Sequence, residues 1–298
     1  MTERRLSARF SVGKHEIYCC GAKVRIENGK IEVLSDPLID YCPLHASLYG
    51  IDKIDVEAVR RSVEMKISQF GFCSENRVFD DSMVVPYGSS EIIRVCMEKK
   101  LLDCAVTVCD GAGTVISWNP SLVQAVGARL NGILRTSPIK STIRYIKEND
   151  GVVLDEGSAK ISQAEGVLKA CQLGFKRIAV TVASFYSNEI LKIRKIEREN
   201  GIKVAIFSVC NTCASREDVE KILAGADVVC AGASRLIREV VGSKALMQLG
   251  VTIPVFVLTS LGKSLVLAYL EWFRDSLVIF RTRKLPYKVE GREPRVKQ

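Results

Sequence analysis

The strongest indication of the fold is the segment Lys176–Cys210, KRIAVTVASFYSNEILKIRKIERENGIKVAIFSVC, because it places a charged helical stretch between two apolar runs. Residues 177–183 and 203–209 are short, almost uninterrupted apolar runs, which is typical of strands buried on both faces of a sheet. Residues 188–200 between them have the pattern of a helix with a solvated, charged face. Strands that alternate with helices in this way predict an α/β fold with a parallel sheet.

The same alternation continues on both sides of this segment. We expect further strands near 103–109, 227–230 and 254–258, and helices near 90–100, 216–224, 235–249 and 262–273. Helix starts are well marked, since Asn119-Pro120 and Ser137-Pro138 place a capping residue before a proline, and Ser162–Glu165 forms a capping box. Residues 86–280 are therefore predicted to form a mostly parallel, doubly wound sheet, either as one domain or as two α/β halves that meet near residue 175.

Residues 1–85 are predicted to form a separate N-terminal unit. Strands at 17–26 and 31–34 flank Glu27–Lys30, whose Asn28-Gly29 pair is typical of a β-hairpin turn. A helix is expected from about 55 to 70, with Gly71 as its stop. The charged end, residues 281–298, is predicted to be a basic tail.

Composition and charge narrow the class of protein. A chain of 298 residues with 47% hydrophobic residues can bury a large core, which excludes disorder and a disulfide-stapled mini-protein. No apolar run is suited to crossing a membrane, and residues 1–6 lack a signal peptide, so we expect a cytoplasmic protein. Arg274–Gln298 holds eight basic and three acidic residues, whereas the body is nearly neutral. Nucleic-acid binding is therefore disfavoured, and the basic end either docks on an acidic partner protein or keeps the chain soluble.

A cysteine and histidine cluster in the N-terminal unit is the first candidate site. Both histidines of the chain lie within four residues of a cysteine, and thiolate plus imidazole is the ligand set of zinc and of some iron–sulfur centres. The predicted metal ligands come from these two segments and from the Cys210-x-x-Cys213 pair: His15, Cys19, Cys20, Cys42, His45 and Cys213. Neighbouring strand residues point to opposite faces, so only one thiol of Cys19-Cys20 is expected to face a shared metal. A catalytic Cys–His pair and ordinary buried side chains remain alternatives.

The carboxyl edge of the predicted sheet is the second candidate site. Cys109, Cys210 and Cys230 each fall at the end of a predicted strand, and Ser184 and Thr259-Ser260 follow the other two. These strand ends would share one crevice, where helix N-termini favour a small anionic ligand. Cys109 or Cys210 could act as a nucleophile there, with Asp110 as acid or base. Contacts to a ligand or cofactor are predicted for small and polar residues of the adjoining loops: Gly111, Gly113, Thr114, Asn211 and Ser234. The alternative is that the loops at this edge of the sheet bind no ligand.

At these motifs the chain resembles the archaeal methanogenesis marker protein 8 family. The residues that carry the resemblance extend over about Lys14–Leu270 and are His15 with Cys19-Cys20-Gly21, Tyr41-Cys42-Pro43-Leu44, Gly88-Ser89-Ser90-Glu91, Val108 to Val115, Asn119-Pro120, Val123-Gln124, Thr136-Ser137-Pro138-Ile139 and Val251 to Val255. The family occurs alongside methyl-coenzyme M reductase in methane-cycling archaea, so the resemblance implies a pathway rather than a reaction.

From this resemblance we expect an accessory or maturation factor for methyl-coenzyme M reductase or its cofactor, with the reductase or its maturation proteins as partners. The alternative is a cytoplasmic thiol-dependent enzyme that acts on a small anionic substrate at the carboxyl edge of the sheet. Whether the protein is an enzyme stays open at this point.

Overall fold

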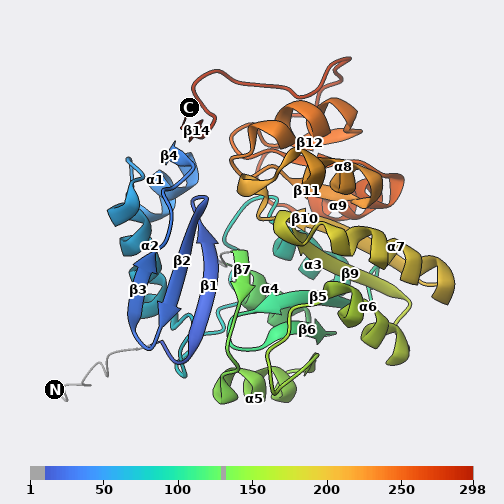
Figure 1. The fold of residues 1–298 in the computed structure, drawn as a ribbon. Coiled ribbons are helices and arrows are strands. Elements are labelled where there is room, and N and C mark those ends of the chain that lie inside the picture. Colours follow the sequence, from blue (N-terminus) through green and yellow to red (C-terminus); the bar gives the residue numbers. More distant parts are fainter. Residues whose placement is uncertain (1–10, 129–131, 298) are drawn as a thin grey trace.

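A computed structural model of the chain describes residues 11–128 and 132–297 and has the expected α/β fold. An eight-stranded sheet with helices on both faces lies beside a four-stranded N-terminal sheet (Figure 1). The large sheet has the order β12-β13-β11-β10-β9-β5-β6-β8. Its strands are β5 (Cys104–Cys109), β6 (Gly113–Ser117), β8 (Gly151–Val153), β9 (Arg177–Ala183), β10 (Lys203–Val209), β11 (Val228–Cys230), β12 (Met247–Leu249) and β13 (Val255–Val257).

The centre of this sheet is parallel, because β5, β9, β10 and β11 run in the same direction. Val180 lies between Val106 and Ile206 in register, and all three side chains are fully buried. Helices bury both faces: α6 (Gln163–Gln172), α7 (Asn188–Asn200) and α8 (Arg216–Gly225) cover one, and α3 (Ser89–Glu98), α4 (Pro120–Gly127) and α9 (Ser260–Trp272) cover the other. Burial on both faces explains the uninterrupted apolar runs of these strands.

Both edges of the large sheet are antiparallel, which corrects the expected direction of the strand at 254–258. The segment predicted as a helix near 235–249 instead forms one π-helical turn, a short 3₁₀ turn and β12, and β12 pairs antiparallel with β13. Without a long crossover helix, the chain cannot return to start another parallel strand. Thr259, predicted at the carboxyl ends of the parallel strands, therefore lies at the end where these strands begin. Its hydroxyl donates a hydrogen bond to Asp227, directly before β11 (2.5 Å).

The N-terminal sheet has the order β3-β2-β1-β7 and is antiparallel throughout. Its strands are β1 (Lys14–Cys19), β2 (Ala22–Glu27), β3 (Lys30–Val33) and β7 (Gly132–Arg135). The predicted helix is confirmed as α2 (Val56–Phe70), and it ends at Gly71 in the left-handed conformation. The predicted Asn28-Gly29 turn is also confirmed, between β2 and β3. Since β7 comes from beyond α4, this pairing joins the first part of the chain to its middle (Figure 1).

The single strand expected at 17–26 is two strands joined by a tight turn at Cys20-Gly21. Cys19 pairs with Ala22, and both turn residues have positive φ, 53° for Cys20 and 81° for Gly21. Positive φ in both turn residues is the pattern of a type I′ hairpin. Cysteine is not a usual residue for this conformation, so the apolar run gave no sign of the turn.

The described C-terminal segment returns to the N-terminal part of the chain. The remaining elements are β4 (Ile39–Tyr41), α1 (Pro43–Tyr49), α5 (Lys140–Glu148) and β14 (Arg295–Val296). β14 pairs antiparallel with β4, and the Arg295 guanidinium lies 4.9 Å from the centre of the Tyr41 ring. The predicted basic tail thus includes a short strand that contacts the N-terminal unit. Within the described ranges, every helix is too short or too polar to cross a membrane.

Candidate metal centre

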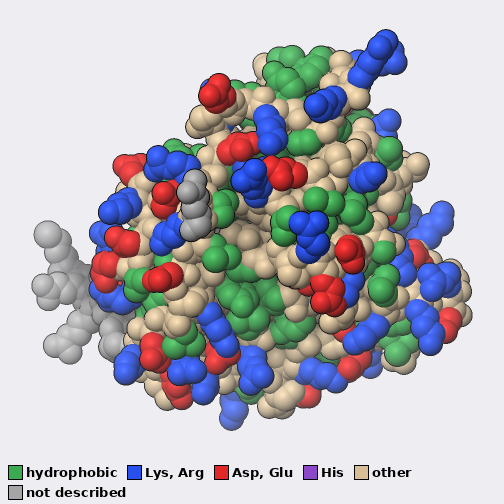
Figure 2. Space-filling view, turned by 45° about the horizontal axis from the view of Figure 1, so that its top comes forward, with side chains coloured by type: hydrophobic (Ala, Val, Ile, Leu, Met, Phe, Trp, Pro, Cys, Tyr) green, Lys and Arg blue, Asp and Glu red, His purple; other side chains and the backbone are tan. Residues whose placement is uncertain are grey.

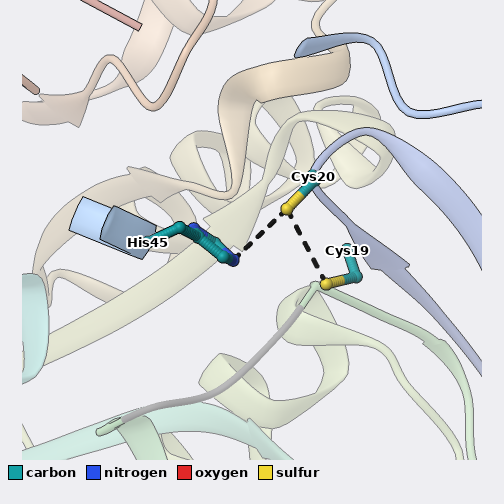
Figure 3. A group of neighbouring side chains, drawn as sticks. All are labelled: Cys19, Cys20 and His45. Carbon is teal, nitrogen blue, oxygen red and sulfur yellow. Dashed lines mark hydrogen bonds between the residues drawn. The ribbon is translucent and has the colours of Figure 1, made fainter. Parts of the chain in front are cut away.

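Two cysteines and one histidine converge beside the Cys20-Gly21 turn (Figure 3). The Cys20 Sγ lies 3.2 Å from the His45 Nε2 and 4.0 Å from the Cys19 Sγ. All three potential ligand atoms lie within 4.8 Å of one another. The group therefore joins the end of β1, the hairpin turn and the first helical turn of α1.

The turn brings Cys19 and Cys20 to the same side. Two adjacent strand residues would point to opposite faces, but the left-handed φ of Cys20 ends this alternation. Gly21 is required beside it, because a Cβ at this position would lie 2.7 Å from the Leu38 side chain. Strained backbone of this kind is concentrated at functional sites, so the strain at Cys20 is itself a sign of a site.

The electrostatics of the group favour one thiolate beside a protonated imidazole. The hydrogen bond shared with Cys20, helped by His45 and Lys66, holds the pKa of Cys19 well below its ordinary value. The same hydrogen bond and burial raise the pKa of Cys20. Burial alone would lower the pKa of His45, but hydrogen bonds and charge interactions with Cys19 and Cys42 raise it to about 9. A buried thiolate is a good ligand for a soft or borderline metal.

Two of the three separations are close to those around a single tetrahedral ion. Zinc bonds of about 2.3 Å to sulfur and about 2.0 Å to nitrogen place neighbouring ligand atoms about 3.5–3.8 Å apart. The observed 3.2 and 4.0 Å lie on either side of that range. Cys42, the N-cap of α1, lies one helical turn before His45 and is a further thiol close to it.

The structure places the other two predicted metal ligands differently. His15 is fully buried near the opposite end of β1, where its ring nitrogens hydrogen-bond to Thr136 (2.7 Å) and to the Val12 carbonyl (2.8 Å). Cys213 comes closer, because its thiol donates to the Gly21 carbonyl at 3.8 Å. Cys213 thus borders the turn, whereas His15 is not brought together with the other predicted ligands.

Cys109 and Cys210 lie at the same edge of the sheet, as their parallel strands require. Cys109 is fully buried, which raises the pKa of its thiol. Asp110 accepts a hydrogen bond from the Cys73 N–H (2.6 Å) and pairs with the Arg77 guanidinium (3.1 Å). Burial also raises the pKa of Cys210 to about 12. Neither predicted nucleophile is in an environment that favours its thiolate, in contrast to Cys19.

The small residues of the glycine-rich loop after β5 hydrogen-bond to, or pack against, neighbouring segments of the chain. The Gly111 N–H donates to the Thr136 hydroxyl (2.7 Å), and the Thr114 hydroxyl accepts from the Ser162 N–H (2.8 Å). A Cβ at Gly113 would lie 2.1 Å from a backbone carbonyl of a neighbouring loop. The small residues predicted to contact a ligand therefore allow close packing of β5, β6 and the segment before α6.

The other two predicted ligand contacts also bond within the chain. The Asn211 amide donates to the Cys230 carbonyl (2.7 Å), which ties the ends of β10 and β11 together. The Ser234 hydroxyl accepts from the Ile237 N–H (3.2 Å) and caps the following turn. Both side chains order loops at the carboxyl edge.

A cavity of about 750 Å³ lies between helices α1 and α2 and the carboxyl edge of the large sheet. Its walls include His45 and Lys66 from one side and Cys210 and Cys230 from the other. The group of Cys19, Cys20 and His45 therefore borders a space large enough for a small organic molecule. The sequence predicted a crevice at this edge of the sheet, and Cys210 and Cys230 line the cavity, but no local pattern indicated that His45 and Lys66 form its other wall.

Comparison with known proteins identifies the family. Residues 15–271 match the family described as an uncharacterized protein conserved in archaea (DUF2099). The chain is also 40% identical to the uncharacterized protein MJ0054 of Methanocaldococcus jannaschii over 247 residues, which cover 83% of this chain and 86% of that protein. The chain therefore belongs to this archaeal family.

Proposed function

We propose that this member of the archaeal DUF2099 family binds a single metal ion, zinc in the first instance, through Cys19, Cys20 and His45. The observation that carries the proposal is the convergence of three ligand atoms within 4.8 Å from two separate segments. A multi-iron cluster distributes its protein ligands over different iron atoms, whereas adjacent Cys19 and Cys20 suit one ion. Cys42 is a candidate for a fourth ligand, because it is the N-cap residue one turn before His45 and its side chain hydrogen-bonds to His45.

We propose that the protein is an accessory or maturation factor in methane metabolism and that it uses this centre to serve methyl-coenzyme M reductase or its cofactor. The proposal is supported by the resemblance carried by the residues around Cys19-Cys20 and Cys42, because Cys19 and Cys20 lie beside His45 and the Cys42 side chain hydrogen-bonds to it. Cys19, the thiol that favours ionisation, is only 3% exposed. Such burial favours a metal ligand over a nucleophile that must reach a substrate.

Protein purified without oxygen is expected to contain about one zinc ion per chain by elemental analysis. Cys20→Asn should lose the metal yet stay folded, because Asn-Gly is the preferred pair for a type I′ turn. Cys171→Ser is the matched control, since this half-buried thiol lies in α6, outside the group, and its loss should leave the zinc content unchanged.

A folded wild-type protein without metal, or a Cys20→Asn variant that retains it, would contradict the single-ion site. The visible absorption spectrum separates the two cofactor classes. A colourless protein that contains zinc supports the proposal. Visible absorption from an iron–sulfur chromophore would show that the site holds a cluster instead of zinc.

We also expect the basic end of the chain to dock the partner. Arg281, Arg283 and Lys284 are exposed and precede β14, so their change to Gln should leave the β4–β14 pairing intact. Recovery of reductase or maturation proteins with the tagged variant should fall several-fold at low salt, because exposed charges speed association. The difference should vanish at high salt.

A second triple variant, with Lys195, Arg198 and Lys203 changed to Gln, removes the same charge from another exposed region. It should recover partners as the wild type does. If both triple variants recovered equally less partner protein than the wild type, the net charge of the chain, rather than its C-terminal segment, would determine the association.

A further inference from the structure

The cavity beside the metal centre lies at the point where the connections of the large sheet diverge. From β5 the chain continues to β6 on one side, and from β9 it continues to β10 on the other, although β5 and β9 are parallel neighbours. Thr107 of β5 and Thr181 and Ala183 of β9 line the cavity. In open α/β sheets, ligands bind outside the carboxyl ends of the strands at such a switch point.

The walls of this cavity are mainly apolar. They include Val85, Tyr87, Ile93, Val108, Tyr186 and Val255. Hydrophobic side chains also gather in the middle of the face shown in Figure 2, with charged side chains around them. An apolar cavity with few polar groups is the usual form of a site for a small organic molecule.

Two buried polar side chains in the walls lack hydrogen-bond partners. The Thr107 Oγ1 and the Gln163 Oε1 have none among the described residues, and the two residues are 4% and 1% exposed. A buried polar atom without a partner is costly, so a native protein that keeps two such atoms in residues of one cavity wall calls for an explanation. Glu91, also in the wall, differs, because its carboxylate accepts from Val84, Val85, Ser90 and Gln124.

We propose that this cavity binds a small, largely apolar organic molecule whose N–H or O–H group donates a hydrogen bond to the Gln163 carbonyl oxygen, with the Thr107 hydroxyl as a second polar contact. The ligand would lie with one end toward Cys210 and His45, next to the metal centre. The inference rests on the cavity and its two unpartnered oxygens, and it holds whether or not a metal is bound.

The test compares two probes of nearly equal shape, naphthalene carboxamide and methyl naphthyl ketone, by isothermal titration calorimetry on the full chain. Only the carboxamide has N–H donors. We expect the wild type to bind the carboxamide about threefold to tenfold more tightly than the ketone, the contribution of one hydrogen bond. Gln163→Leu should remove this preference. Thr142→Val is the control, because it deletes a buried hydroxyl that also has no hydrogen-bond partner in the described part of the chain but lies in α5, outside the cavity.

Ala183→Leu, which adds volume to the cavity wall, should abolish binding of both probes while the melting temperature shows that the protein is folded. Absence of carboxamide binding to wild type, equal affinity for both probes, or binding unaffected by Ala183→Leu would each overturn the inference. Repeating the titration with Cys20→Asn separates this result from the metal proposal. Probe binding without zinc would leave the cavity site standing, and zinc without probe binding would leave the metal centre standing.

Discussion

Replacing Asp110 with Asn is expected to lower the free energy of unfolding by about 3–5 kcal/mol, as measured by urea denaturation. The Arg77 and Asp110 side chains are 3% and 2% exposed, so the change leaves the guanidinium charge buried without its counter-ion. The carboxylate also accepts the Cys73 N–H, which ties the segment after α2 to the end of β5. The large effect follows from desolvation, because the remaining charge has no access to water.

The exposed Lys160–Glu165 pair provides the control. Its two side chains are about half exposed, so Glu165→Gln should change the free energy of unfolding by less than about 1 kcal/mol. Replacing both buried partners, as Arg77→Met with Asp110→Leu, should cost less than Asp110→Asn alone. Equal effects of Asp110→Asn and Glu165→Gln would show that the buried pair is not important for stability.

Raising the pH above about 9 is expected to destabilise the metal-free protein steeply. Burial raises the pKa of Cys96 to about 12 and raises the pKa of Cys104 and Cys109 as well. A thiol with a folded pKa above its unfolded value of about 9 keeps its proton when folded and loses it on unfolding. Its contribution is therefore complete below pH 9 and is lost as the pH rises toward the folded pKa, by about 1.4 kcal/mol per pH unit for each thiol.

Denaturation by urea at several pH values between 7 and 10.5, with the metal removed by a chelator, measures this slope. Cys96→Ala should make the fall in the free energy of unfolding above pH 9 less steep by about 1.4 kcal/mol per pH unit, the contribution of one proton. The variant should nevertheless be less stable at every pH. A free energy of unfolding that stays constant from pH 8 to 10.5 would contradict the assigned burial of these thiols.

The sequence predicts the local features of this fold well. The strands at 177–183 and 203–209, the Asn28-Gly29 turn and the helix that ends at Gly71 all follow from patterns of neighbouring residues, and the structure contains them. Their success has a physical reason, since turn preference, capping and burial on two faces depend on contacts within a short segment.

The features that sequence reasoning missed depend on distant contacts or on a turn residue of an unusual type. The antiparallel direction of β13 results from its pairing with β12 and β11, and no local pattern encodes it. Cys20 adopts an unusual left-handed turn that an apolar run conceals. Cysteine and histidine clustering predicted a group of side chains able to hold a metal, but only the fold shows that His45 meets Cys20 and His15 does not.

The pairing of β7 with β1 sets an order of events during synthesis on the ribosome. More than a hundred residues separate the two strands, which at about 5–20 residues per second is roughly ten seconds of translation. During that time β1 is an open edge of the nascent sheet, and open edges are prone to pair with other chains. The hairpin that carries Cys19 and Cys20 and the helix that carries His45 emerge early, so a metal ion can reach these side chains before β7 covers the edge of β1.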